Sequence, residues 1–190
     1  MFADILHIDI QGLLAINGAH SRFLDFLMGW VSNTYVWLPL YLLFFWLLYR
    51  RYGRRIWIVL LAVVVLITLS DQSSVWIKES VMRLRPCHEP SLSGCIHLVN
   101  NKCGGSYGFV SSHAANVFAL SAFLVITLRW GLWAVVAIFF WSGLVGYSRI
   151  YLGVHYPLDV LCGALLGLAI GFTVGWLTRR IARESSVDIT

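Results

Sequence analysis

Residues 56–77, IWIVLLAVVVLITLSDQSSVWI, decide the fold of this chain. The stretch is mainly apolar, with a polar cluster at residues 70–74, and contains a single charged side chain, Asp71. A helix of this length crosses the roughly 30 Å hydrocarbon core of a bilayer at a rise of about 1.5 Å per residue. The stretch therefore predicts a transmembrane helix rather than a helix of a water-soluble domain.

Four further apolar segments accompany this one along the chain. They lie at residues 34–50, 111–129, 131–148 and 155–178. Each is long enough to span a bilayer as a helix, and polar or basic stretches separate them. We therefore expect an all-α polytopic membrane bundle of five or six transmembrane helices.

The composition agrees with a membrane protein and excludes other classes. Of the 190 residues, 59% are hydrophobic and 12% are charged, and the mean hydropathy is +0.77. These values exclude a disordered or nucleic-acid-binding tail and argue against a soluble domain. Basic residues beside the spans explain much of the net charge of +5, so no nucleic-acid partner is expected.

Arginine placement predicts the orientation of the spans. If the chain alternates across the membrane, one side collects Arg50, Arg51, Arg54, Arg55, Arg129, Arg179, Arg180 and Arg183. By the positive-inside rule this side is cytoplasmic, and it includes the polar tail 179–190. The segment 78–110 and the turn 149–154 then face the periplasm or the exterior. Residues 86–108, with several Gly and Pro, form the main loop on that side.

The N-terminal residues 1–33 fit two topologies. The pieces 4–17 and 21–31 are amphipathic and acidic, which favours an interfacial hairpin at the outer face. The alternative is a sixth span with the N-terminus inside. A basic start followed by an unbroken apolar run is lacking, so no cleavable signal peptide is expected. Residues 1–190 are expected to form one domain with its helical core at 34–178.

Three basic residues lie where predicted spans meet the outer face, and the positive-inside rule does not explain them. Lys78 and Arg85 are two helical turns apart, and a continuing helix would place both on one face. Arg149 ends the 131–148 segment. Cations that converge at the mouth of a bundle suggest a phosphate site, and anchoring to lipid headgroups is the alternative.

Two histidines lie beside these cations in the predicted topology. His113 follows Ser111 and Ser112 at the start of a span. Free backbone N–H groups at the start of a helix can bind a phosphate, but an ordinary N-cap is the simpler explanation of this Ser-Ser-His sequence. His155 and Asp159 are four residues apart and share a helical face. The carboxylate can accept the Nδ1–H of the imidazole and leave Nε2 free as a nucleophile or base.

These residues belong to three motifs that together resemble one family. KESVMRLRP at 78–86 fits K-x6-R-P, VSSH at 110–113 resembles P-S-G-H, and SRIYLGVHYPLD at 148–159 fits S-R-x5-H-x3-D. This signature is similar to that of the type 2 phosphatidic acid phosphatase superfamily, over roughly residues 34–178. The middle motif departs from the pattern at Val110 and Ser112. A backbone N–H at Ser112 can still serve where the family has glycine.

The resemblance implies a reaction and roles for these side chains. His155 would attack phosphorus and form a phosphohistidine, and Asp159 would orient it. His113 would protonate the leaving group and then activate water. The phosphoryl oxygens would be held by Lys78, Arg85, Arg149, Ser111 and the Ser112 amide. The resemblance implies no metal and no other cofactor.

Three other features have a structural and a functional interpretation. Asp71 is interpreted as part of an inward polar network rather than as a catalytic group. Arg83 lies off the face shared by Lys78 and Arg85, and it would contact a headgroup, a second phosphate or solvent. Glycines recur every four residues at Gly163, Gly167, Gly171 and Gly175, which favours close helix packing inside the bundle over a dimer seam.

Three cysteines lie in the loop at 86–108. A disulfide between Cys87 and Cys103 would close the ends of this loop, although Cys95 leaves the pairing open. A zinc site with His88 and His97 is disfavoured, because the spacing is irregular and no C-x2-C knuckle is present.

The sequence thus predicts a metal-independent lipid phosphatase of the bacterial inner membrane, with its active site facing the periplasm. The resemblance offers phosphatidylglycerophosphate, phosphatidate, undecaprenyl diphosphate and lipid A as substrates. A phosphotransferase with a lipid or sugar acceptor is the alternative, and a non-catalytic membrane or transport protein ranks third. The expected partners are the lipid phosphate substrate and membrane lipids, and a monomer is favoured.

Overall fold

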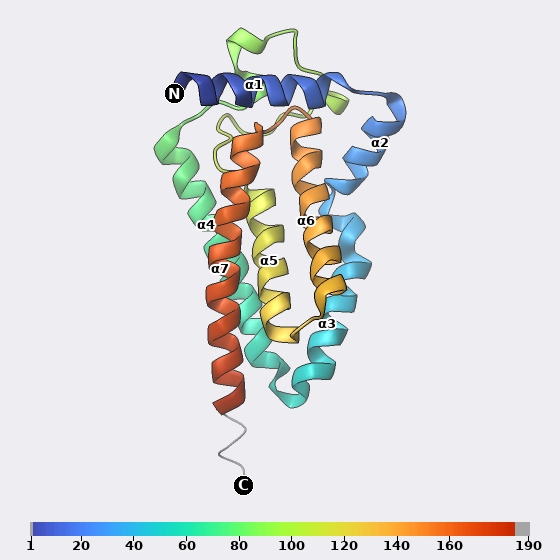
Figure 1. The fold of residues 1–190 in the computed structure, drawn as a ribbon, viewed down its shortest axis with the longest axis vertical. Helices are drawn as coiled ribbons and strands as arrows, with labels where there is room; N and C mark the ends of the chain where they lie inside the picture. Colours follow the sequence, from blue (N-terminus) through green and yellow to red (C-terminus); the bar gives the residue numbers. More distant parts are fainter. Residues whose placement is uncertain (1, 185–190) are drawn as a thin grey trace.

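The computed structural model describes residues 2–184, and the elements found there are helical (Figure 1). Seven α-helices follow one another: α1 Phe2–Gly18, α2 Arg22–Val31, α3 Leu38–Tyr52, α4 Ile56–Val81, α5 Ser112–Leu128, α6 Leu132–Tyr151 and α7 Pro157–Glu184. Short 3-10 turns join them at Thr34–Trp37 and Gly53–Arg55, and three more lie in the loop after α4 at Pro86–His88, Pro90–Leu92 and Val99–Asn101.

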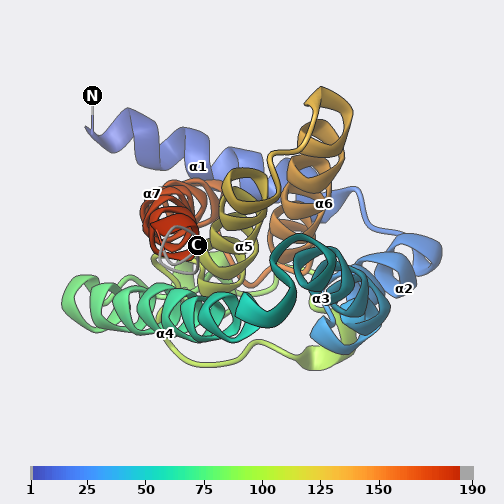
Figure 2. The same ribbon diagram turned by 90° about the horizontal axis from the view of Figure 1, so that it is seen from below.

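Helices α3 to α7 form the bundle that the apolar segments predict. Figure 2 looks along the bundle and shows α5 among its neighbours, and α5 contacts α3, α4, α6 and α7. Three stretches are long and apolar enough to cross a membrane, namely Thr34–Val81, Leu132–Tyr151 and Pro157–Ala182, and Ser112–Leu128 is a shorter apolar helix. The first of these stretches contains both α3 and α4, which run in opposite directions (Figure 1).

The last helix is longer than the sequence predicts. The expected tail begins at residue 179, but α7 continues to Glu184. The arginines Arg179 and Arg180 do not end the helix, because basic side chains in a last turn interact favourably with the helix dipole. The remainder of the predicted tail, residues 185–190, lies outside the described part of the chain.

Helix α1 lies across one end of the bundle, as Figure 1 shows, and not alongside the other helices. Its inward side chains Asp9, Leu13 and Asn17 are buried, and the amide of Asn17 donates to the carbonyls of His97 and Tyr151. The amphipathic pattern at 4–17 therefore corresponds to a helix that packs on the bundle end. Neither α1 nor α2 is among the stretches long and apolar enough to span a membrane.

The glycine stripe of α7 packs against α5 inside the chain. A Cβ atom added at Gly163, Gly167 or Gly171 would lie 2.5, 2.1 or 2.3 Å from a backbone carbonyl oxygen of α5. The absence of side chains lets the two helix backbones come this close. The preference for packing within the bundle is confirmed, and the stripe fixes the start of α7 against the start of α5.

Candidate active site

The residues from the three sequence motifs come together at the bundle end that α1 covers. Helices α4 and α6 end there, and α5 and α7 begin there (Figure 1). His113 interacts electrostatically with His155, Lys78, Arg85 and Arg149. Segments that are far apart in the chain thus place two histidines and three cations in one site.

His155 and Asp159 form a buried pair at the start of α7. Asp159 is fully buried, and its Oδ2 lies 3.5 Å from Nδ1 of His155, which is longer than a tight hydrogen bond. Burial lowers the pKa of His155 to about 4, although the nearby carboxylate of Asp159 opposes this shift. His155 is therefore neutral near pH 7, as a nucleophilic imidazole must be.

The first turn of α5 carries the second motif. Ser111 is the N-cap: its hydroxyl accepts from the N–H of Ala114 at 3.5 Å, and its own N–H donates to the carbonyl of Asp159 at 2.8 Å. Because helix starts leave N–H groups unpaired, the backbone of Ser112 and His113 can bind an anion. Ser111 therefore serves first as a cap, which is the simpler of the two expectations for this serine.

The serine that replaces the family's glycine contacts a predicted phosphate ligand. The hydroxyl of Ser112 accepts a hydrogen bond from Nζ of Lys78 and lies 2.6 Å from the hydroxyl of Ser74. Ser74 in turn donates to the carbonyl of Asp71 at 2.7 Å. Ser74 and Ser112 thus form a network that supports Lys78 next to the site, and Asp71 joins it through its backbone carbonyl.

Arg85 is held by the loop that follows α4. Its Nε donates to the carbonyl of Tyr107 at 3.1 Å, and its Nη1 donates to the carbonyl of Cys103 at 3.4 Å. Burial lowers the pKa of Arg85, and the charge of Asp159 opposes this shift. Arginine still remains charged at neutral pH, so the guanidinium keeps the donors that a phosphate requires.

Arg149 enters the site from the end of α6. Its Nη1 donates to the hydroxyl of Ser32, which follows α2, and its buried Nε has no protein partner. A buried unpaired donor is costly unless a ligand or water satisfies it. Neighbouring Ser148 instead turns away, because its hydroxyl donates to the carbonyl of Val145 at 2.7 Å.

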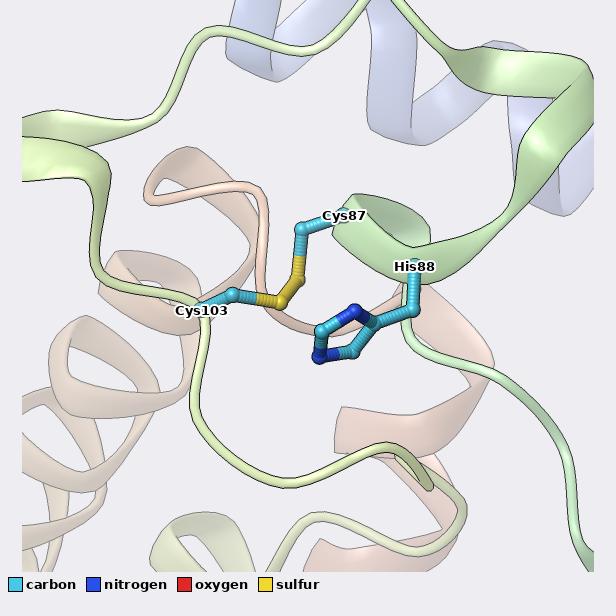
Figure 3. Close-up of side chains that lie close together, drawn as sticks. All are labelled: Cys87, His88 and Cys103. Atoms are coloured by element: carbon cyan, nitrogen blue, oxygen red, sulfur yellow. A yellow bond between two sulfur atoms is a disulfide. The ribbon is translucent and has the colours of Figure 1, made fainter.

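The disulfide between Cys87 and Cys103 forms as expected, with a Cα–Cα distance of 6.0 Å. It joins the residue after Pro86 to the residue whose carbonyl contacts Arg85. Figure 3 shows His88 beside the disulfide, and these three residues are close enough to hold a metal ion. With both sulfurs bonded to one another, the two cysteines cannot act as zinc ligands.

We expect the double variant Cys87→Ser/Cys103→Ser to unfold at lower temperature. The bridge closes a loop with a sequence separation of 16, for which chain entropy predicts about 3 kcal/mol of stabilisation. Thermal unfolding in detergent would measure the change. The control is Cys95→Ser, because Cys95 is exposed and unbridged. Equal unfolding temperatures for the two proteins would contradict a stabilising bridge.

Arg83 has a different environment from any of those expected. Its Nη1 donates to Asp159 Oδ1 at 2.8 Å, its Nη2 donates to Asp9 Oδ2 at 2.6 Å, and its guanidinium lies 3.8 Å from the ring centre of Tyr156. It is therefore neither a solvated charge nor placed for a headgroup. The sequence does not mark Asp9 as a site residue, because its charge fits equally well with the acidity of an amphipathic segment.

A cavity of about 490 Å³ opens onto the site between α3, α4 and α5. Ser112 and His113 line it where it meets the motif residues, and apolar side chains line most of the rest. The lining residues are Thr34, Tyr41, Phe44, Phe45, Leu48, Leu60, Val63, Ile67, Asp71, Ser112, His113, Asn116, Val117, Leu120 and Leu124. A polar site thus joins an apolar cavity within the membrane-spanning part of the bundle.

Known proteins resemble this chain in sequence and in fold. The family model described as PAP2 superfamily matches residues 58–183. The chain is 36% identical to a lipid A 4'-phosphatase of Bacteroides thetaiotaomicron over 97% of this chain and 81% of that protein. It is 35% identical to an undecaprenyl-diphosphatase of Sulfolobus acidocaldarius over 83% of this chain and 72% of that protein. A transmembrane PAP2-type phosphatidylglycerolphosphate phosphatase of Bacillus subtilis has a similar fold, with a TM-score of 0.73, 23% identity and coverage of 94% and 88%.

Proposed function

Because the chain belongs to the PAP2 superfamily of membrane phosphatases, we propose that it hydrolyses a phosphate ester of a membrane lipid through a phosphohistidine. The observation that carries this proposal is the apolar cavity that meets His113 and Ser112. The phosphate of such a lipid would bind to the cations of the site, and its hydrocarbon chains would lie in the apolar cavity. A soluble phosphate ester would leave the cavity unused.

In the first step, Nε2 of neutral His155 attacks phosphorus while the bond from phosphorus to the lipid oxygen breaks. His113 donates a proton to this oxygen, so the lipid leaves as a neutral alcohol. Asp159 stabilises the positive charge that His155 acquires. A substrate diphosphate would release a lipid phosphate by the same step.

In the second step, His113 takes a proton from water, and the resulting hydroxide attacks the phosphohistidine. The phosphorus–nitrogen bond breaks, inorganic phosphate leaves and His155 returns to its neutral form. Lys78, Arg85 and Arg149 balance the charge on the phosphoryl oxygens in both transition states. Backbone N–H groups of Ser112 and His113 add donors at the positive end of α5.

Among the candidate substrates, we propose that lipid A is the preferred one. This choice rests on the similarity to a lipid A 4'-phosphatase, which extends over almost the whole chain. Undecaprenyl diphosphate comes next, on the similarity to an undecaprenyl-diphosphatase. The arginine-bearing turns lie at the opposite end of the bundle from the site, which supports a site that faces the periplasm of a bacterial inner membrane.

The test is phosphate release by detergent-purified protein from a panel of lipid A, undecaprenyl diphosphate, phosphatidylglycerophosphate and phosphatidate. EDTA is present throughout, and we expect release to continue because the cations replace a metal ion. Vanadate, which mimics phosphate, should inhibit release. A folded protein that releases phosphate from none of these lipids would contradict hydrolysis. Dephosphorylation of the lipid only when a sugar or lipid acceptor is added, with the phosphoryl group recovered on that acceptor, would favour phosphotransfer instead.

A further inference from the structure

We propose that Asp9 of α1 is a positioning residue for the nucleophile, acting through Arg83 and Asp159. The inference rests on the proposed function, because it concerns the histidine that would attack phosphorus. It assigns a catalytic contribution to the N-terminal helix, which lies before the matched family region at residues 58–183.

The first observation is a continuous chain of charged groups. The carboxylate of Asp9 accepts from Nη2 of Arg83 at 2.6 Å, and Nη1 of Arg83 donates to Asp159 Oδ1 at 2.8 Å. The other oxygen of Asp159 faces Nδ1 of His155 at 3.5 Å. The side chains of both aspartates are fully buried, and that of Arg83 is 20% exposed. The chain is therefore shielded from water along most of its length.

The second observation is that Asp9 also caps the helix that carries Asp159. Its Oδ1 accepts from the backbone N–H of Leu158 at 2.8 Å. Leu158 lies in the first turn of α7, where backbone N–H groups have no partner within the helix. A side chain of α1 thus supplies the cap for α7 from outside, and both oxygens of Asp9 are used.

The charges explain why a second carboxylate is needed. If Arg83 contacted Asp159 alone, its positive charge would offset the negative charge that must stabilise His155 when it becomes cationic. Asp9 neutralises part of the positive charge of Arg83. The negative charge of Asp159 can therefore stabilise cationic His155 more strongly. The guanidinium also lies over the ring of Tyr156, which fixes its plane. Asp159 Oδ1 is thereby held, and Oδ2, which accepts from the backbone N–H of Tyr156 at 3.0 Å, lies toward the imidazole.

The test compares Asp9→Asn with Asp4→Asn in the full-length protein in detergent. Asparagine keeps the shape of Asp9 and removes its charge, whereas Asp4 is an exposed acid on the same helix. Loss of one charge-assisted hydrogen bond predicts a decrease in kcat of about 10- to 100-fold for Asp9→Asn. KM and the inhibition constant for vanadate should stay near those of the wild type, since Lys78, Arg85 and Arg149 are unchanged.

Several results would overturn the inference. One is a kcat for folded Asp9→Asn equal to that of Asp4→Asn. Another is an increase in KM and in the vanadate inhibition constant with kcat unchanged, which would indicate a role in binding. If Asp9→Asn does not fold, Arg83→Lys takes its place, because one ammonium group cannot reproduce the fork between two carboxylates. A wild-type kcat in folded Arg83→Lys would equally refute the proposal.

Failure of this inference and failure of the proposed function give different results. If wild type releases phosphate and Asp9→Asn does so equally well, only the role of Asp9 is wrong. If wild type releases none, nitrogen NMR of histidine-labelled protein tests Asp9 without turnover. We expect His155 to carry its proton on Nδ1 in wild type and Asp4→Asn, and to populate both tautomers in Asp9→Asn. One unchanged tautomer in all three proteins would refute the inference by itself.

Discussion

Replacing His155 with alanine is expected to reduce phosphate release from lipid substrates to the uncatalysed background. The imidazole is the group proposed to bond to phosphorus, and it is buried and neutral beside Asp159. Loss of a nucleophile costs about a million-fold in kcat in a well-studied protease, and an effect of that order is expected here. The variant should still fold, because alanine removes a side chain whose Nδ1 makes no hydrogen bond.

The measurement is phosphate release together with trapping of a covalent phosphoenzyme from labelled lipid phosphate. Wild-type protein should acquire an acid-labile label on histidine, and His155→Ala should acquire none. His7→Ala is the matched control, since His7 is an exposed histidine of α1 that bonds only to Gln11 among the described contacts. Turnover by His155→Ala above background, or label at another residue, would refute the assignment of the nucleophile.

Replacing Gly167 with alanine should impair both stability and activity, although the change adds one methyl group. The new Cβ would lie 2.1 Å from the carbonyl oxygen of Ala115, so α5 and α7 must move apart. Overpacking of this kind costs about 1–3 kcal/mol of unfolding free energy. Because α5 carries His113 and α7 carries Asp159, a displacement of about 1 Å predicts a loss of about 100-fold in kcat.

Gly143→Ala is the matched control for this change. Gly143 lies in α6 with nothing within 4 Å of an added Cβ, and alanine is a better helix former than glycine by about 1 kcal/mol. We expect Gly143→Ala to unfold at the same or a higher temperature than wild type and to keep its activity. Thermal unfolding and kcat would be measured for both variants. Equal values for the two would contradict the close α5–α7 contact.

Much of the fold could be predicted because membrane insertion depends on local properties. The ends of α4 and α6 differ from the predicted spans by a few residues, since hydropathy does not mark where a helix stops outside the apolar core. Lys78 sits in the last turns of α4, and Met82 ends that helix with a left-handed backbone. The pairing of Cys87 with Cys103 was one of the options left open by Cys95, and only the loop conformation selects it.

The sequence by itself determined the membrane class, the spans and the motif residues, because these depend on runs of apolar residues and on fixed spacings along one helix. His155 and Asp159 are an example, since a separation of four residues places them on one face. Tertiary structure alone decided what Arg83 and Asp9 do. Arg83 is separated by 74 residues from Asp9 and by 76 from Asp159. No local pattern encodes such partners, because they meet only when α1 packs across the start of α7 and buries both carboxylates.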